Sequence, residues 1–143
     1  MELKNFGGVL SFAAELEAEH EAFYRCAAEN PACGAERGLF GELAGEHKQN
    51  EQRVLRVRRE NVTEMVLEPI KDFTKAPFVG ECGGADRMKR ETVVETARKI
   101  EGQAERFYRE AAEKIRGLPE VAGQLRLIGK RHSAHAEKLA QLS

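Results

Sequence analysis

A stretch of fifteen residues occurs twice in this chain, and this repeat constrains the fold more than any other feature of the sequence. The segment ELEAEHEAFYRCAAE at 15–29 aligns with KIEGQAERFYREAAE at 99–113, at an offset of 84 residues. The residues that the repeat pairs are Glu17 with Glu101, Tyr24 with Tyr108 and, at an offset of 85, His47 with His132 and Asn50 with His135. Self-similarity at a fixed offset indicates that one structural unit occurs twice.

Each unit contains two segments whose apolar residues recur at helical spacing. The stretches NPACG and RGLP, rich in helix breakers, separate the two segments of each unit. The predicted helices cover 9–29, 36–65, 90–115 and 120–142. Each unit is therefore predicted to be a helical hairpin.

The stretch between the units, LEPIKDFTKAPFVGECGGADRM at 67–88, has no clear periodicity, although it has room for a short helical turn. It is long for a connection inside a compact domain, but a crossover that runs back along a bundle needs about this length. The sequence therefore predicts a single all-α domain over 1–143. This domain is an antiparallel four-helix bundle with internal pseudo-twofold symmetry and a long crossover between its second and third helices.

Polar residues interrupt the predicted core-facing stripe of every helix. The fourth stripe, for example, runs through Ile128, His132, His135 and Leu139, and its only polar members are the two histidines. The polar members of the other stripes are Glu17, His20 and Tyr24 in the first helix, His47 and Asn50 in the second, and Glu101 and Tyr108 in the third. Two carboxylates and several imidazoles that meet in one bundle core are a donor set for a metal ion.

Each candidate also has a simpler explanation. A single core histidine is more often a residue satisfied by hydrogen bonds than a metal ligand, but four histidines with two repeat-matched glutamates favour a metal. Tyr24 and Tyr108 are expected to reach the nearby glutamates as outer partners of the site, since each follows its glutamate by seven residues. Glu51 is a candidate partner of His47. The other glutamates near the stripes are expected on the solvated face: Glu21, Glu42, Glu46 and Glu105.

The four helical segments resemble the rubrerythrin-like branch of the ferritin-like superfamily. The residues that carry the resemblance are ELEAEHEAFYRCAAE, FGELAGEHKQNEQRVLRV, KIEGQAERFYREAAEKI and LIGKRHSAHAEKL. The resemblance implies a ferritin-like crossover bundle that holds a carboxylate-bridged di-iron site, acts on peroxide or dioxygen or handles iron, and forms a homodimer. It also implies that Glu17 and Glu101 are the glutamate ligands of the first and third helices, and that His135 is the histidine ligand of the fourth.

The chain departs from the family pattern at both of its ExxH motifs. His132 occupies the glutamate position of the second motif, and His47 and Asn50 occupy the two ligand positions of the first. His20 has no counterpart in the basic pattern. A nitrogen-rich set suits one divalent ion, or two held by solvent bridges, and shifts the preference toward zinc, nickel, copper or ferrous iron. The resemblance makes iron the first metal expected, with zinc, manganese, nickel or copper as alternatives. The predicted metal ligands are Glu17, His20, His47, Asn50, Glu101, His132 and His135.

The charge, apolar content and cysteines of the chain limit the kinds of partner and location that are expected. The net charge is −1, and the charges are mixed along the chain, so neither nucleic acid nor an anionic membrane is expected as a partner. No stretch reaches 18 apolar residues, and the acidic start does not resemble a signal peptide. Cys26, Cys33 and Cys82 form no CxxC motif, so neither a disulfide framework nor a Cys₄ site is expected. A reducing cytoplasm is the expected location.

Three classes of function compete for this sequence. The first is a rubrerythrin-like oxidoreductase that acts on peroxide or dioxygen. It would need an external electron donor, because the chain lacks the paired CxxC motifs of a rubredoxin module. The second is a module for metal storage, sensing or delivery. The third is a structural bundle whose di-iron site has decayed into hydrogen-bonded His–Glu pairs. The sequence identifies no catalytic residue.

Overall fold

A computed structural model of the chain describes residues 5–61, 73 and 84–142. The described residues form four α-helices and one short 3₁₀ helix, η1, and they contain no strand. The helices are α1 (Phe6–Glu29), η1 (Pro31–Glu36), α2 (Arg37–Glu60), α3 (Arg90–Lys114) and α4 (Pro119–Ala140). The predicted all-α fold with four helices is therefore confirmed.

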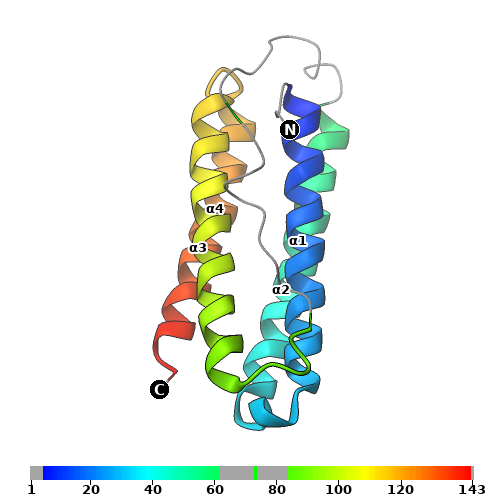
Figure 1. Cartoon of the computed structure of the whole chain (residues 1–143). Coiled ribbons are helices and arrows are strands. Elements are labelled where there is room, and N and C mark those ends of the chain that lie inside the picture. The colour runs from blue at the N-terminus through cyan, green and yellow to red at the C-terminus, as the bar shows by residue number, and fades with distance from the viewer. Residues whose placement is uncertain (1–4, 62–72, 74–83, 143) are drawn as a thin grey trace.

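The helices pack in two pairs, α1 with α2 and α3 with α4 (Figure 1). Only Asn30 and η1 lie between α1 and α2, and 115–118 join α3 to α4. Fewer residues approach one another between the pairs, from α1 to α3 and from α2 to α4. This packing fits a helical bundle in which each half of the repeat forms one helix pair.

Most helix bounds lie within two residues of the prediction, but α1 begins at Phe6, three residues early. The side chain of Asn5 caps this helix by accepting a hydrogen bond of 2.7 Å from the backbone N–H of Gly8. Such a cap offsets the poor helix propensity of Gly7 and Gly8. The described part of α2 ends at Glu60. The predicted end at Met65, most of the 67–88 connection and Cys82 lie outside the described residues.

Two buried side chains connect the first helix pair to the start of the second. Asn30, at the end of α1, donates hydrogen bonds to the backbone oxygens of Ala85 and Met88, at 2.8 and 2.7 Å. Glu36, in η1, accepts from Arg90 at 2.6 Å. The beginning of α3 is therefore fixed beside the turn that joins α1 to α2.

A polar layer divides the apolar core into two clusters. One cluster contains Phe12, Phe107 and Leu125, together with Phe73, whose ring stacks on Phe107 at 5.7 Å. The other contains Phe40 and Leu139. The buried polar side chains between them are Glu17, His20, His47, Asn50, Glu101, His132 and His135.

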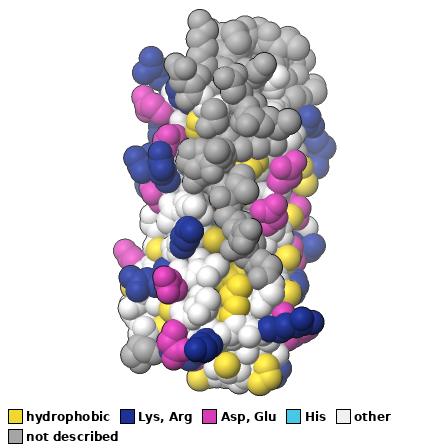
Figure 2. All heavy atoms as spheres, viewed as in Figure 1, with side chains coloured by type: hydrophobic (Ala, Val, Ile, Leu, Met, Phe, Trp, Pro, Cys, Tyr) yellow, Lys and Arg dark blue, Asp and Glu magenta, His cyan; other side chains and the backbone are white. Residues whose placement is uncertain are grey.

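The outer faces of the helices carry charges of both signs. Figure 2 shows Lys and Arg side chains close to Asp and Glu side chains on the face in view, and no histidine is visible there among the described residues. Several of these charges pair along one helix, as Arg106 does with Glu110 at 2.6 Å. Within the described ranges, no helix has the length and apolar character needed to cross a membrane.

Candidate metal centre

All seven predicted metal ligands are buried. Their relative exposure is 0–3 %, and each of the four α-helices contributes at least one of them. The burial predicted from the core-facing stripes is therefore confirmed. What the structure adds is the set of partners of each side chain.

Two glutamates and two histidines form a closed ring of hydrogen bonds. The Nδ1 and Nε2 atoms of His47 lie 2.7 Å from Glu17 Oε1 and 2.8 Å from Glu101 Oε2. The Nδ1 and Nε2 atoms of His132 lie 2.6 Å from Glu101 Oε1 and 2.7 Å from Glu17 Oε2. Because a carboxylate oxygen only accepts, all four ring nitrogens donate, and both histidines are held as imidazolium cations. Two cations thus balance two carboxylates in the bundle core.

The ring sets the electrostatics of its members. Burial alone would lower the pKa of His132, but the carboxylates of Glu17 and Glu101 outweigh it and raise the pKa to about 10. The pKa of His47 is raised in the same way. Burial would raise the pKa of each glutamate, but His132 and His47, joined by His135 at Glu101, lower both values well below the usual range. Charge pairing therefore outweighs desolvation throughout the ring.

The tyrosines reach the glutamates, but not in the pairing that the sequence predicted. Tyr24 donates to Glu101 Oε2 at 2.7 Å, and Tyr108 donates to Glu17 Oε2 at 2.6 Å. Seven residues span about 10.5 Å along a helix, too far for a tyrosine to reach the glutamate of its own helix. The ring of Tyr24 stacks instead on His47 of its own helix pair, as the ring of Tyr108 does on His132. Each tyrosine therefore contacts both halves of the repeat.

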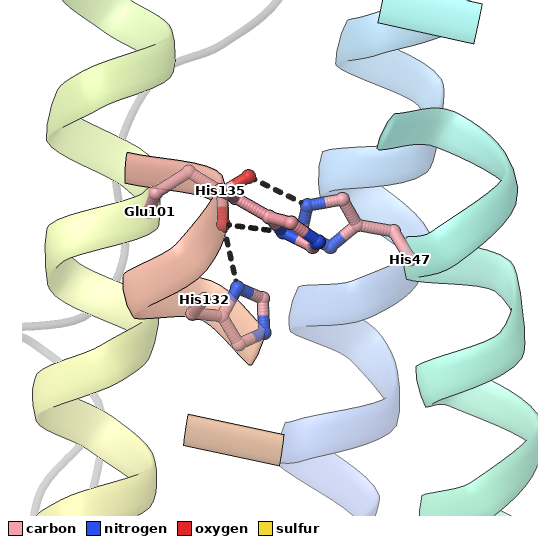
Figure 3. A group of neighbouring side chains, drawn as sticks. All are labelled: His47, Glu101, His132 and His135. Carbon is pink, nitrogen blue, oxygen red and sulfur yellow. Dashed lines mark hydrogen bonds and ion pairs between the residues drawn. The ribbon is translucent and has the colours of Figure 1, made fainter. Parts of the chain in front are cut away.

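Four residues bring possible metal-binding atoms close together. One ligand atom from each of His47, Glu101, His132 and His135 lies within 4.8 Å of the others, and all four residues are buried (Figure 3). The Nδ1 atom of His135 lies 3.3 Å from Glu101 Oε1. Glu17 is outside this group, although both of its oxygens belong to the ring. Such a group could hold a metal ion.

His20 and Asn50 lie at the edge of the centre. The imidazole of His20 packs edge-on against His47, at 5.3 Å, and its Nδ1 has no hydrogen-bond partner among the described residues. Burial and the positive charge of His47 lower the pKa of His20 to about 3, so this ring is neutral. Asn50 accepts a hydrogen bond of 3.0 Å from Arg53, and its Nδ2 is buried without a partner in the described part of the chain.

Glu51 and Glu46 differ from their predicted roles. Glu51 is not a partner of His47, because Glu17 and Glu101 occupy both nitrogens of that ring. Glu46 was predicted to face solvent, but its Oε2 lies 3.3 Å from Nε2 of His135. The stripe pattern missed Glu46 because position 46 lies about 100° around the helix from the stripe position His47. Its side chain is 37 % exposed, so it reaches the centre from the flank.

Comparisons with protein-family models, curated proteins and solved structures found no match to this chain. The functional argument therefore rests on the residues of the centre and their geometry. Fold alone would not identify a function in any case, because one fold carries many chemistries.

Proposed function

We propose that the buried cluster of histidines and glutamates binds a divalent metal ion. The observation that carries this proposal is the convergence of ligand atoms from His47, Glu101, His132 and His135 within 4.8 Å. Imidazole nitrogen and carboxylate oxygen are the ligands that zinc and ferrous iron use in proteins. Glu17 completes the set, since it contacts both His47 and His132.

The chain's own residues explain how the ligands would be oriented. Tyr24 and Tyr108 donate to the two carboxylates and fix their planes. Hydrogen bonds from such outer partners hold ligand atoms in place and tune the metal. His47 and His132 would release protons on binding, because a metal needs an unprotonated nitrogen. Metal binding by this chain is therefore proton-linked.

The finer assignment follows the resemblance. We propose a rubrerythrin-like protein of the ferritin-like superfamily, with antiparallel helix pairs and a crossover between α2 and α3. Iron is the first metal expected, and zinc, manganese, nickel or copper are the alternatives. A bound ion with an open coordination position would supply redox chemistry toward peroxide or dioxygen. An external electron donor and a homodimer belong to this proposal.

Elemental analysis of the purified chain, paired with anomalous scattering from crystals, tests the metal site. We expect about one ion per chain at the cluster, by the ligand count of a single site. The double replacement His132→Ala with His135→Ala and the single replacement Glu101→Gln should each remove this ion. Glu105→Gln is the matched control, because Glu105 is one turn further along α3 and pairs with Arg109 at 3.2 Å. Full metal content after the double replacement would refute the site.

A peroxide assay of the metal-loaded chain separates an oxidoreductase from a storage or sensing module. An oxidoreductase should consume peroxide faster than the same concentration of free metal. A chain that binds the metal but shows no turnover with iron, manganese or copper is a binding module.

The closed ring itself favours a second candidate, a structural bundle without a metal. Its hydrogen bonds of 2.6–2.8 Å satisfy every nitrogen and oxygen of Glu17, His47, Glu101 and His132. A ring that is complete in this way could stabilise the core on its own. In that case no divalent ion would raise the melting temperature, whereas a tightly bound metal would raise it.

A further inference from the structure

Two polar atoms face each other at the seam between α2 and α4 without forming a hydrogen bond. The Oε2 atom of Glu46 and the Nε2 atom of His135 are 3.3 Å apart. Each atom is buried and has no hydrogen-bond partner within the described residues. The His135 residue is 1 % exposed, whereas the Glu46 side chain is 37 % exposed. The pair therefore joins the buried centre to the solvent.

The second ring nitrogen of His135, Nδ1, has a hydrogen-bond partner, and this leaves Nε2 as the free nitrogen. Nδ1 lies 3.3 Å from Oε1 of Glu101 and donates to it. An imidazole that donates through Nδ1 can present a lone pair at Nε2. Metal-ligating histidines almost always give their second nitrogen to a carboxylate or carbonyl in this manner. His135 is thus oriented as a ligand whose open nitrogen points toward Glu46.

The separation of the two free atoms fits a cation between them. Two ligand atoms of a tetrahedral zinc site, each about 2.1 Å from the ion, are about 3.4 Å apart. The observed 3.3 Å between Nε2 and Oε2 is close to this spacing. A cation between the atoms would also satisfy both of them, and an unsatisfied buried polar atom costs free energy.

The ring offers no comparable vacant position. All four nitrogens of His47 and His132 already face carboxylate oxygens, so a metal there must displace protons and break charge-assisted hydrogen bonds. A cation at His135 and Glu46 breaks none of these bonds. An ion can therefore bind at the free pair while the ring keeps its protons and its hydrogen bonds.

Glu46 differs from the nearby Glu42 in having no lysine or arginine partner among the ion pairs of the described residues. Glu42, one turn earlier on α2, pairs with Lys138 of α4 at 3.0 Å. This ion pair neutralises Glu42, and both of its side chains are roughly half exposed, at 54 % and 43 %. Glu46 instead keeps its carboxylate oxygen directed at the histidine.

We propose that Glu46 and His135 form an outer cation position through which a divalent ion enters the buried centre. This inference rests on the proposed metal-binding function and adds the access route and the first ligand pair. Glu46 captures the ion from solvent, and His135 shares it with the cluster around Glu101.

Titration of the metal-free full-length chain with Co²⁺, followed by visible absorption and stopped-flow mixing, tests this position. Glu46→Gln should weaken the first Co²⁺ affinity about tenfold or more and slow its uptake. The matched control Glu42→Gln removes the same charge from the same seam and should change affinity by about twofold or less. Crystals of the unmodified chain soaked in Zn²⁺ should show an anomalous peak between Glu46 and His135, which does not depend on any variant.

The outcomes separate this inference from the function on which it rests. If the unmodified chain binds Co²⁺ and Glu101→Gln abolishes binding, but Glu46→Gln binds as tightly and as quickly as the unmodified chain, the outer position is wrong and the metal site stands. If Glu42→Gln weakened the Co²⁺ affinity as much as Glu46→Gln, the effect would come from the loss of any negative charge at this seam, and the outer position would be wrong. If the unmodified chain binds no Co²⁺, both proposals fail together.

Discussion

At the scale of single residues, the main feature is a histidine where the family resemblance leads one to expect a glutamate. His47 and His132 occupy these positions, and each supplies a positive charge that the glutamate would not. The two positive charges of the ring therefore cancel the two negative charges of Glu17 and Glu101. A carboxylate in either position would leave buried negative charge that a bound cation or added protons would have to balance.

The metal-free chain should be most stable near pH 6.5. The raised pKa of His132, about 10 against an ordinary 6.5, contributes stability that is complete below pH 6.5 and is lost as the pH rises toward 10. The lowered pKa values of Glu17 and Glu101 contribute stability that is present above pH 4.5 and is lost in acid. The pKa of His20 is lowered to about 3, so this residue adds a further loss of stability as the pH falls below 6.5.

Urea unfolding in the presence of a chelator, from about pH 3, the lowered pKa of His20, to about pH 10, the raised pKa of His132, measures this profile. A free energy of unfolding that stays level from pH 7 to about 10 would contradict the charged ring. A metal-loaded sample serves as the control. Its free energy of unfolding should fall less at high pH, because the metal replaces the protons that high pH removes.

Removing one carboxylate should destabilise the metal-free core strongly. Glu101→Gln leaves two imidazolium groups facing a single glutamate, and breaking a buried ion pair on one side costs about 3–5 kcal/mol. Glu105→Gln, at a partly exposed position of the same helix outside the ring, should change the free energy of unfolding by about 0.5 kcal/mol or less. Urea midpoints at pH 6.5 measure the difference. Equal effects from both variants would show that the ring contributes nothing.

Burial of the site residues could be predicted from the sequence, but their partners could not. The stripes required only the helical period, which places His132 and His135 on the same face of one helix as Leu139. The bond from Tyr24 to Glu101 depends on how two helices far apart in the sequence align, and no local pattern contains that information. Glu46 was missed because its side chain reaches the centre from the flank of its helix.

At the scale of helices, the close approach of α3 and α4 depends on one glycine. A Cβ atom added at Gly129 would lie 3.2 Å from Cβ of Tyr108. Tyr108 cannot shift freely, because its hydroxyl donates to Glu17 and its ring stacks on His132. The glycine therefore lets α4 approach α3 closely enough for these contacts to form.

Gly129→Ala should destabilise the chain by about 1–3 kcal/mol, the usual cost of overpacking. The same replacement at Gly123 is the control, because nothing lies within 4 Å of an added Cβ there. It should be neutral or stabilising by about 0.5–1 kcal/mol, since alanine is the better helix former. Thermal melts of both variants give the comparison. A stabilising effect at Gly129 would mean that the α3–α4 contact is looser than the structure indicates.

The helices themselves were well predicted, because long periodic segments give the strongest sequence signal. Their ends depend on capping, which involves single side chains. The early start of α1 rests on Asn5, whose side chain accepts from Gly8 ahead of a pair of glycines. Propensity alone places the start of the helix after those glycines.

At the scale of the whole molecule, the polar layer joins the two helix pairs. Four of its hydrogen bonds cross from the α1–α2 pair to the α3–α4 pair: those of Tyr24 and His47 with Glu101, and those of Tyr108 and His132 with Glu17. Each pair supplies one glutamate, one histidine and one tyrosine to this set. The sequence predicted these matched contributions through its repeat, but the crossing of the bonds appears only in the structure.

Placing glutamate at the two positions where the resemblance leads one to expect it should make folding depend on a metal. In the double replacement His47→Glu with His132→Glu, four carboxylates would meet in the core, and their repulsion should prevent folding of the metal-free chain at neutral pH. Added Mn²⁺ or Fe²⁺ should restore helicity, measured by far-ultraviolet circular dichroism. The double replacement Lys48→Glu with Lys130→Glu, on exposed faces of the same helices, should fold without metal. A metal-free double variant as stable as the unmodified chain would show that the core tolerates unbalanced charge.

The bonds that cross between the helix pairs also protect the chain from assembling incorrectly. Apolar side chains exchange neighbours at little cost, so a bundle with a uniform core could slide by one helical turn, about 5.4 Å, and still bury its surface. In this chain such a slip would break the four crossing hydrogen bonds, so each imidazolium would keep only the glutamate of its own helix pair and leave buried nitrogen and oxygen atoms unpaired. The polar layer thus sets the alignment of the two helix pairs, because only one alignment closes the ring and pairs every buried nitrogen and oxygen in it.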